Sequence, residues 1–370
     1  MKNKTLICLL AFFILICSLL CGCELEKLIS ENLNSEVILQ GTISSEDIGL
    51  TVSFIDVGQG DSTLIECGEE TMLIDAGLYG ERNTVCSYLS NRGIESIDYC
   101  VATHPHADHI GGMSEVIYRF DVDTLVYPLC DNDSQQWNYV LDACDEKGVS
   151  YFNPQPGDSF TLGDATITLF SPSKKDDYDN LNNYSMVLKL EYGDVSFLFT
   201  GDAEKEVEKS LVSKGFDLSA DVLKCGHHGS STSTCKSFLE AVNPAAAVIS
   251  CGKNNEYGHP HKETMESLSQ RNIQVFRTDL SSTIIAQSDG KKISFASASE
   301  ALGEVIPTSQ TAATIATSAV YQYIGNKNSK VFHTTDCGSV DTMKEKNKVY
   351  FYTRDEATDK DYKPCEECKP

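Results

Sequence analysis

The sequence predicts a layered α/β or α+β domain followed by a small cysteine-containing domain. The chain has 370 residues, which is enough for one domain of about 250 residues and a smaller one. Over residues 50–299, short apolar runs broken by Gly and Asp alternate with helical stretches, as in mixed layered domains. Residues 300–319 lose this periodicity and have the Ala, Thr and Ser content of a linker, and residues 320–370 regain aromatic residues and cysteines.

The regular elements of the larger domain follow one another in a strand-rich order. A tight turn at residues 58–61, Gly-Gln-Gly-Asp, joins the first two predicted strands. The strand at residues 99–103 leads directly into a polar loop, and loops of this kind are where functional sites are built. We expect helices at residues 82–92 and 204–214, and strands at residues 51–57, 62–67, 72–77, 99–103, 165–170, 185–192, 195–200, 221–225 and 246–250.

The N-terminus resembles an export signal. Two lysines precede an apolar run at residues 6–20, which is too short for a comfortable transmembrane helix but suits the core of a signal peptide. The run ends in a segment that resembles the lipobox of bacterial lipoproteins, so Cys23 is the expected lipidation site. We expect residues 1–22 to be a signal peptide, residues 23–49 a linker, and the chain to be held at the extracellular face of the membrane by a lipid anchor. An ordinary signal peptide and an uncleaved anchor are the alternatives, and both also place the bulk of the chain outside the cytoplasm.

The net charge limits the classes of partner. Lys and Arg total 30 against 54 Asp and Glu, which gives a formal net charge of -24. This charge repels polyanions and anionic membrane surfaces at long range. Bound divalent ions can still attract an anionic group locally, because they are often the strongest charges in their neighbourhood. Bulk charge therefore disfavours nucleic acid without excluding it as a substrate, and no protein partner is predicted.

The 15 cysteines of the chain do not predict a specific disulfide. In an exported protein this number would normally suggest disulfide bonds. Several of the cysteines between the two termini, however, lie in apolar strand-like runs, where a buried free cysteine acts as a small hydrophobic residue. We therefore expect free thiols in the core of the larger domain.

The histidines are grouped rather than scattered. His104, His106 and His109 lie within six positions and enclose Asp108. Alternate positions on an extended segment direct the imidazoles of His104 and His106 to one side, where both can bind one ion. Asp108 and His109 follow a turn and can reach a second ion nearby. Imidazole and carboxylate ligands suit zinc, and the carboxylate share also admits manganese or iron.

Residues 103–112 resemble the HxHxDH signature of the metallo-β-lactamase superfamily. Supporting motifs follow the superfamily order, with Asp75 in Ile-Asp-Ala-Gly, Asp202 in Phe-Thr-Gly-Asp, and Lys-Cys-Gly-His-His-Gly-Ser at residues 224–230. The resemblance implies an αββα sandwich with a dinuclear metal site. It also implies that Asp75 orients the metal-binding loop and that Asp202 bridges both ions.

Within this superfamily, the chain is similar to the hydrolase domain of ComEC competence proteins and its free-standing relatives. Residues 54–62, the His-His-Gly-Ser segment and residues 257–260 carry this similarity, which extends over residues 50–297. It implies a phosphodiester substrate, whereas other superfamily members attack a lactam or a thioester.

One departure from the superfamily pattern affects the metal ligands. Many members supply a third histidine just before the bridging aspartate, but this chain has no histidine between the HxHxDH segment and His227. An asparagine-rich segment at residues 182–185 takes its place, as in ComEC-like members. His227 or His228 would then complete the shell of one metal and His259 that of the other. We favour His228 as the ligand and expect catalytic roles for His227 and Asp108. The expected metal ligands are His104, His106, Asp108, His109, Asp202, His228 and His259.

The C-terminal segment contains a second set of potential ligands, His333, Cys337, Cys365 and Cys368. This composition fits a closed structural zinc site of Cys3His type. With the neighbouring aromatic residues, the segment resembles the zinc-binding domain of the Ada DNA-repair protein, with a histidine in place of the first cysteine. That domain contacts DNA, so the resemblance implies a nucleic-acid tether. The alternatives are a Cys365–Cys368 disulfide and a purely structural role in which these residues only stabilise the fold.

Together these patterns predict an exported metal-dependent hydrolase with two divalent ions, zinc or manganese, and one structural zinc ion. The expected substrate is a phosphodiester in extracellular nucleic acid, with DNA as the leading candidate. Two other functions stay open. One is a surface phosphoesterase that acts on a cell-wall or phosphocholine-type polymer, and the other is a binding lipoprotein whose metal site no longer turns over.

Overall fold

The computed structural model describes residues 47–297 except 131, and residues 323–368 except 335–336, 342, 345–346, 352–353, 361 and 366–367. The chain divides into two compact units, one within residues 1–306 and the other within residues 307–370. The expected signal peptide, the lipidation site at Cys23 and the linker at residues 300–319 lie outside the described residues. None of the described helices is long and apolar enough to cross a membrane.

The first unit contains an eight-stranded mixed sheet. Its strands, in sheet order, are β15 (Ile293–Ser297), β14 (Ile284–Ser288), β1 (Leu50–Phe54), β2 (Thr63–Cys67), β3 (Glu70–Ile74), β4 (Ser96–Val101), β5 (Asp121–Val126) and β6 (Ser150–Phe152). Neighbours from β15 to β3 pair antiparallel. Strands β3 to β6 run parallel to one another. The parallel half is joined through helices, because parallel neighbours need a long crossover connection.

A seven-stranded sheet packs against the first. Its strands, in sheet order, are β13 (Gln274–Arg277), β12 (Ala246–Ile249), β11 (Val222–Lys224), β10 (Val195–Phe199), β9 (Val187–Tyr192), β8 (Ala165–Ser171) and β7 (Ser159–Leu162). Strands β10 to β13 are parallel, and strands β7 to β10 are antiparallel. Both sheets therefore combine an antiparallel half with a parallel half.

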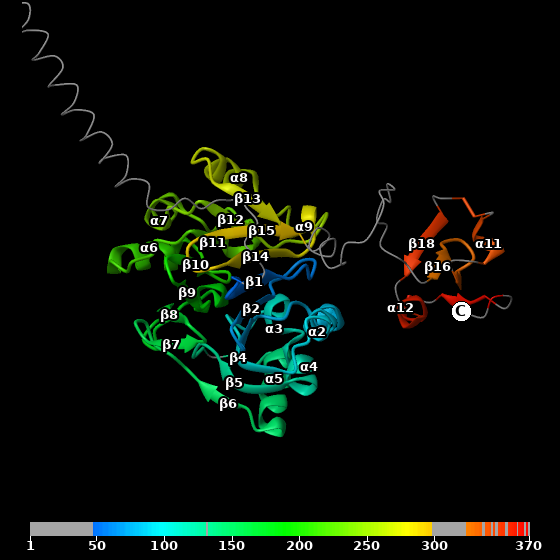
Figure 1. The fold of residues 1–370 in the computed structure, drawn as a ribbon, viewed down its shortest axis with the longest axis horizontal. Coiled ribbons are helices and arrows are strands. Elements are labelled where there is room, and N and C mark those ends of the chain that lie inside the picture. The colour runs from blue at the N-terminus through cyan, green and yellow to red at the C-terminus, as the bar shows by residue number, and fades with distance from the viewer. Residues whose placement is uncertain are drawn as a thin grey trace, which may run out of the picture. The chain divides into compact units, whose positions relative to one another are not determined.

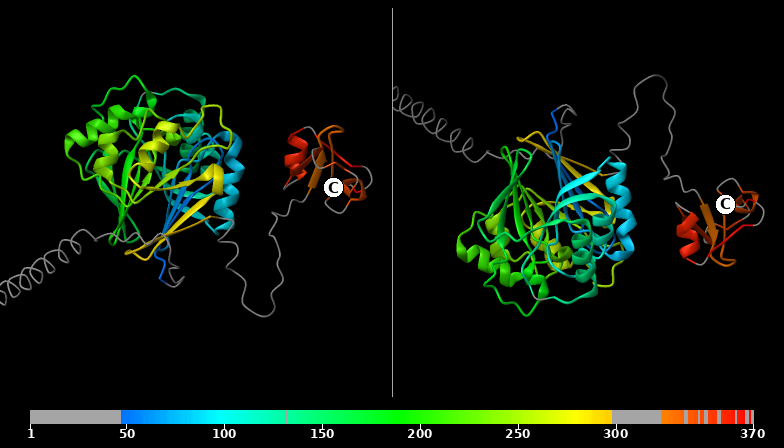
Figure 2. Two further views of the ribbon diagram at one scale, coloured as in Figure 1. Left: turned by 90° about the horizontal axis from the view of Figure 1, so that it is seen from above. Right: turned by 90° about the horizontal axis from the view of Figure 1, so that it is seen from below.

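Helices cover the outer side of each sheet (Figures 1 and 2). The first sheet is covered by α2 (Arg82–Asn91), α3 (Ala107–Ile110), α4 (Met113–Arg119) and α5 (Gln135–Lys147). The second is covered by α6 (Lys205–Lys214), α7 (Lys236–Val242) and α8 (Lys262–Ser269), with the short α9 (Thr278–Ser281) after β13. Helix α5 begins after Ser134, whose hydroxyl accepts a hydrogen bond from the Trp137 amide. It ends before Gly148, whose left-handed φ of 73° is incompatible with a continued α-helix.

Three hydrophobic clusters hold these layers together. The central cluster lies between the sheets and includes Phe54 and Phe199, whose ring centroids are 6.2 Å apart. A second cluster lies between the first sheet and helices α2, α4 and α5, and a third lies between the second sheet and helices α6, α7 and α8. Because both sheets are covered on both faces, central strands such as β1 are buried along their whole length. The observed layer order confirms the expected αββα sandwich.

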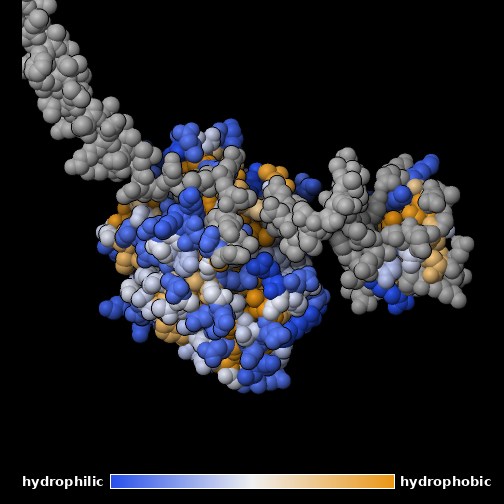
Figure 3. Space-filling view, in the orientation of Figure 1, coloured by the Kyte–Doolittle hydropathy of each residue, from blue (hydrophilic) through white to orange (hydrophobic). Residues whose placement is uncertain are grey.

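The outer faces of the helices are solvated. In Figure 3, hydrophilic residues dominate the visible face of the first unit, and hydrophobic residues occur there in scattered spots. Ion pairs at the i, i+4 spacing support the exposed helix faces, as between Lys262 and Glu266 at 3.3 Å on α8. Each helix therefore presents one apolar face to its sheet and one charged face to water.

The loops that carry the expected site residues follow the carboxyl ends of parallel strands. The HxHxDH loop follows β4 in the first sheet, and the loops with Asp202 and with His227 and His228 follow β10 and β11 in the second. In open α/β sheets, ligands bind outside the carboxyl ends of the strands. The Met186 amide donates a hydrogen bond to the Thr103 carbonyl at 3.0 Å, which joins the two sheets at this edge.

The second unit is built on a four-stranded sheet in the order β18 (Lys348–Phe351), β16 (Tyr323–Asn326), β17 (Val331–Thr334) and β19 (Lys363–Pro364). Two short helices, α11 (Gly338–Asp341) and α12 (Arg354–Asp359), complete its described part. A small core forms around Phe332 and Phe351, which are fully buried. A core of this size is typical of domains that need a metal ion or a disulfide for stability.

Candidate metal centre

The HxHxDH loop brings His104 and His106 together. Their facing ring nitrogens, Nε2 of His104 and Nδ1 of His106, lie 3.0 Å apart. The other ring nitrogen of His104 lies 3.1 Å from the Thr103 hydroxyl and 3.3 Å from the Ser185 hydroxyl. Ser185 also accepts a hydrogen bond from the Asp202 amide at 2.9 Å. These contacts fix the His104 ring so that Nε2 faces the same space as His106.

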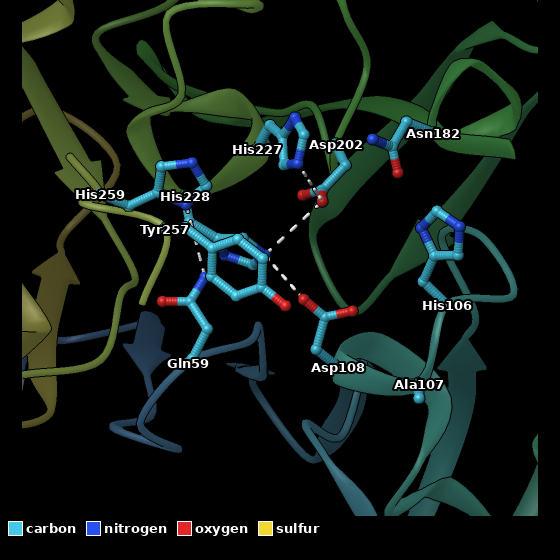
Figure 4. A pocket seen from close by; sticks show the side chains of 10 residues that line it. All are labelled: Gln59, His106, Ala107, Asp108, Asn182, Asp202, His227, His228, Tyr257 and His259. Carbon is cyan, nitrogen blue, oxygen red and sulfur yellow. Dashed lines mark hydrogen bonds and ion pairs between the residues drawn. The ribbon is translucent and has the colours of Figure 1, made fainter. Parts of the chain in front are cut away.

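Asp202 lies between His109 and His228. One carboxylate oxygen of Asp202 is 3.2 Å from His109 Nε2, and the other is 3.5 Å from His228 Nε2. His228 Nε2 also lies 3.2 Å from Asp108 Oδ2. Figure 4 shows Asp202, His228 and Asp108 converging on the cavity from different elements. The structure thus groups two imidazoles and two carboxylates around one point.

The Asp75 carboxylate contacts Nδ1 of His109, the ring nitrogen opposite the one that faces Asp202. Its Oδ2 lies 2.7 Å from His109 Nδ1, and the carboxylate accepts hydrogen bonds from the Thr103 amide and hydroxyl at 2.9 and 2.7 Å. The strand predicted at residues 72–77 ends at Ile74, because Asp75 has a left-handed φ of 58°. This turn directs the carboxylate to the HxHxDH loop. A carboxylate behind a histidine fixes the ring so that its other nitrogen can bind a metal.

Asp61 contacts His228 in the same way and is itself paired with Lys224, and neither residue was among the site residues predicted from the sequence. Asp61 Oδ1 lies 3.3 Å from His228 Nδ1, which is also 3.1 Å from the Ser250 carbonyl. Lys224 is buried and donates a hydrogen bond to the other Asp61 oxygen at 2.8 Å. Burial raises the pKa of the Asp61 carboxyl, but Lys224 and His228 outweigh this effect and lower it to about 2. In the sequence, Asp61 stands out only as the last residue of the Gly-Gln-Gly-Asp turn. That pattern by itself predicts a connection between two strands and not a contact with a metal ligand.

The backbone at the His-His-Gly-Ser segment is strained. His227 and His228 have φ values of 51° and 54°, and consecutive non-glycine residues in this left-handed region are uncommon. Such strain persists only where the surrounding structure enforces it, and it occurs often at functional sites. Here the turn directs both imidazoles towards Asp202, with His227 Nε2 at 3.7 Å from Asp202 Oδ2. The other nitrogen of His227 lies 3.1 Å from the Thr232 hydroxyl.

His259 lies at the wall of the same cavity. Its ring centroid is 5.5 Å from that of His227 and 6.1 Å from that of His228. Its Nδ1 is 3.5 Å from the Gln59 amide nitrogen. In this unit, the described residues Asp61, His109, Asp202 and His228 form a group whose ligand atoms all lie within 4.8 Å of one another. The group does not include the expected ligands His104, His106, Asp108 and His259. The cavity itself has a volume of about 290 Å³ and is open to solvent.

The charges and unpaired atoms of this site fit a bound cation. His109 Nε2 and Asp202 Oδ1 are buried atoms without a hydrogen bond among the described residues. Burial lowers the pKa of His228, but Asp202 and Asp61 outweigh it and raise that pKa to about 10. A field that favours a proton on an imidazole also favours a divalent cation in its place. The donor set of imidazoles and carboxylates is the one that zinc and manganese accept.

The second unit brings its four expected ligands together. Ligand atoms of His333, Cys337, Cys365 and Cys368 all lie within 4.8 Å of one another. His333 lies on β17, and the Cys365 amide donates a hydrogen bond to the Phe332 carbonyl beside it. No disulfide joins the described cysteines, so the structure contradicts the Cys365–Cys368 disulfide alternative. A closed set of three sulfur atoms and one imidazole is typical of structural zinc.

Each of the two units matches a known protein family. Residues 55–253 match the metallo-beta-lactamase superfamily, and residues 312–370 match the metal binding domain of Ada. The first match covers the HxHxDH loop, Asp202 and the His-His-Gly-Ser segment. The second covers His333 and the three cysteines of the second cluster.

Individual relatives come from bacterial competence and nuclease proteins. ComE operon protein 3 of Bacillus subtilis is 35% identical over 252 residues, which are 63% of this chain and 32% of that protein. Competence protein ComA of Neisseria gonorrhoeae is 31% identical over 243 residues, 63% of this chain and 31% of that protein. Exodeoxyribonuclease WalJ of Streptococcus pneumoniae is 33% identical over 128 residues, 34% of this chain and 46% of that protein. The chain thus spans about a third of the length of the two competence relatives.

The contact between Lys224 and Asp61 leads to a prediction about stability. Lys224→Met should lower the free energy of unfolding by about 3–5 kcal/mol, because the buried Asp61 carboxylate would lose its ammonium partner and would face only His228. Urea denaturation at pH 7 measures this change. Addition of Asp61→Asn to the variant should recover part of the loss.

A matched control is Lys189→Met. Lys189 is also buried, but the side chain of its partner Asp217 is 77% exposed, so this change should cost only about 1 kcal/mol or less. Equal losses for Lys224→Met and Lys189→Met would show that Asp61 does not need the charge of Lys224.

Proposed function

The chain belongs to the metallo-beta-lactamase superfamily and is a hydrolase of that superfamily, and from this we propose that it cleaves phosphodiesters in nucleic acid outside the cytoplasm. The observation that carries the proposal is the position of the buried Asp202 carboxylate, which lies 3.2 Å from Nε2 of His109 and 3.5 Å from Nε2 of His228. The Asp202 amide also donates to the Ser185 hydroxyl, which lies 3.3 Å from His104 Nδ1. A carboxylate placed between these two groups of histidines could be shared by two ions. Two-metal sites are typical of phosphatases and nucleases.

In this proposal, His104, His106 and Asp202 would hold one ion, and Asp108, His109, His228 and Asp202 would hold the other. The distances favour His228 over His227 as the residue that completes the second set. His228 Nε2 lies 3.2 Å from Asp108 and 3.5 Å from Asp202, whereas His227 Nε2 lies 3.7 Å from Asp202. When bound, the two ions supply an activated water nucleophile and neutralise charge on the reacting phosphate. Zinc and manganese both suit these ligands.

The protein groups around the ions orient and stabilise the reacting atoms. Asp75 and Asp61 hold the rings of His109 and His228 through their Nδ1 atoms. His227 is held at Nδ1 by Thr232, and its Nε2 faces the cavity beside Asp202. We propose that His227 stabilises the leaving oxygen by donating a hydrogen bond from Nε2. Asp108, whose Oδ2 lies 3.2 Å from His228 Nε2, would orient a proton of the nucleophile through its other oxygen.

Two relatives support nucleic acid as the substrate, since one is named as a competence protein and the other as an exodeoxyribonuclease. The net charge of -24 favours a second candidate, a phosphoesterase that acts on a less anionic cell-wall or phosphocholine-type polymer. The lipobox-like segment at Cys23 supports export and a lipid anchor for either activity. The second unit, as a zinc module, would help to hold the substrate.

The substrate proposal predicts metal-dependent cleavage of DNA. The purified chain with manganese or zinc should cleave single-stranded or double-stranded DNA and a chromogenic phosphodiester, and a chelator should abolish both activities. Gel electrophoresis and absorbance measure the two reactions. Cleavage of the small ester but not of DNA would contradict the nuclease function and support the polymer phosphoesterase. Bound metal without any cleavage would contradict both enzyme functions and support a binding protein.

The bridging role of Asp202 predicts a change in metal content. Asp202→Ala should remove about two ions from the first unit, because both sets of ligands share this carboxylate. Mass spectrometry of the metal content against the wild type measures the loss. Asp164→Ala, at an exposed turn of the first unit, serves as the control and should retain all ions. Unchanged metal content in Asp202→Ala would contradict the bridging role.

The second unit should contain one zinc ion that stabilises its fold. Cys365→Ser should remove about one ion and lower the melting temperature of this unit, because a closed zinc site contributes directly to the folding free energy of a small domain. Metal analysis and calorimetry measure the two effects. Cleavage of the chromogenic ester should persist, and Cys130→Ser should keep the zinc. Retention of zinc by Cys365→Ser would contradict the assignment.

A further inference from the structure

Tyr257 is an exposed aromatic residue at the mouth of the metal cavity. Its relative exposure is 66%, although large hydrophobic side chains are usually buried. It lines the same cavity as Asp108, Asp202 and His228. In Figure 4 the Tyr257 ring lies across the cavity, in front of His228 in this view. Of the described large hydrophobic residues that are exposed, Tyr257 alone lines this cavity.

The ring of Tyr257 packs against His259 on one side. The two ring centroids are 5.6 Å apart and the ring planes differ by 20°, which is an offset stack. With one face partly covered by His259 and the side chain 66% exposed, an aromatic surface remains open to a ligand. Such a surface beside a hydrolytic site can bind a flat group of the substrate.

The loop that carries Tyr257 is held in place by hydrogen bonds. The Asn255 side chain donates to the carbonyls of Gly252 and His259 at 2.9 and 2.6 Å and accepts from the His259 amide at 2.9 Å. The Tyr257 carbonyl lies 3.1 Å from Nε2 of His261. The other nitrogen of His261 accepts from the Ser231 amide at 2.9 Å, in the loop after His228.

These contacts give the aromatic surface a fixed position relative to the metal ligands. His261 joins the Tyr257 backbone to the loop after the His-His-Gly-Ser segment, so the two loops form one hydrogen-bonded assembly. A surface that is ordered before binding loses little conformational entropy when a ligand stacks on it.

An adjoining hollow gives space for the rest of a polymer. It has a volume of about 520 Å³ and shares Gln59 with the metal cavity. Lys253, at the start of the same loop, lines it. The described residues that line the metal cavity include no Lys or Arg, and the hollow is lined by Lys253 together with Asp56 and Asp279. The charge of this lining therefore gives a polyanion no net attraction, and the contribution of the hollow is space.

We propose that Tyr257 is a stacking platform for an unpaired nucleobase next to the scissile phosphodiester, an inference that rests on the proposed nuclease function. Aromatic side chains bind single strands by stacking on successive bases, and this stacking tolerates any base because every base has a flat face. In a duplex, both faces of an interior base are already stacked and its edge is paired. The platform therefore makes single-stranded DNA the preferred substrate.

The test compares an intact single-stranded oligonucleotide with one that contains abasic sites around the cleavage position. The wild-type chain should cleave the intact strand with a KM about tenfold lower than that for the abasic strand. Tyr257→Leu should raise the KM for the intact strand about tenfold, with kcat unchanged within about twofold, and should leave the abasic strand unaffected. Tyr257→Phe should keep the wild-type KM and kcat for both strands, because stacking needs the ring and not the hydroxyl.

The controls distinguish the stacking role of Tyr257 from the proposed nuclease function. Tyr139→Leu changes an exposed tyrosine that does not line the metal cavity, and it should leave both substrates unaffected. Equal KM values for the intact and abasic strands in both the wild type and Tyr257→Leu would overturn the stacking role while leaving the nuclease function standing. Loss of activity in Tyr257→Phe as well would also overturn it, because the hydroxyl would then be the required group. No cleavage of either strand by the wild type would instead overturn the nuclease function itself.

Discussion

The burial of the Asp202 carboxylate is the constraint on which the rest of the site depends. A buried carboxylate needs positive charge close to it, and His109 and His228 face its two oxygens. Those imidazoles can hold a metal only if their other nitrogens are fixed. Asp75 fixes one and Asp61 the other, which adds two further buried carboxylates. Each of these contacts adds a buried carboxylate to the site, and bound divalent cations would compensate this negative charge.

The same contacts hold the two sheets together. Asp61 and Asp75 follow strands of the first sheet, whereas Asp202 and Lys224 belong to the second. The Lys224–Asp61 contact therefore crosses the interface between the sheets, between residues 163 positions apart in sequence. Left-handed backbone at Asp75, His227 and His228 costs of order 1–3 kcal/mol at each residue. The packed sandwich enforces these conformations, so the fold and the site stabilise each other.

Sequence patterns could predict the part of the site that lies within continuous motifs. The spacing of His104, His106 and His109 directs their side chains without reference to the rest of the chain, and the layered fold follows from alternating strands and helices. Asp61 and Lys224 could not be paired in this way, because their contact depends on the register of two sheets that the sequence does not specify. The same is true of the choice between His227 and His228. The two histidines are adjacent in sequence, and only the packed structure shows that His228 Nε2 faces Asp108.

An acidic chain that binds a polyanion must do so locally. With a formal net charge of -24, long-range attraction is absent, and a groove of basic residues that neutralises many phosphates would be opposed by the field of the whole protein. The metal cavity instead combines its metal-ligand side chains with an exposed ring at Tyr257, and the adjoining hollow is lined by Lys253 together with Asp56 and Asp279. Binding through one or two neutralised phosphates and a stacked base would release few counterions, so its affinity would depend only weakly on salt. On the proposed function, such a site would select the end or the unpaired region of a strand by shape, and an acidic protein would then act on nucleic acid without adhering to it.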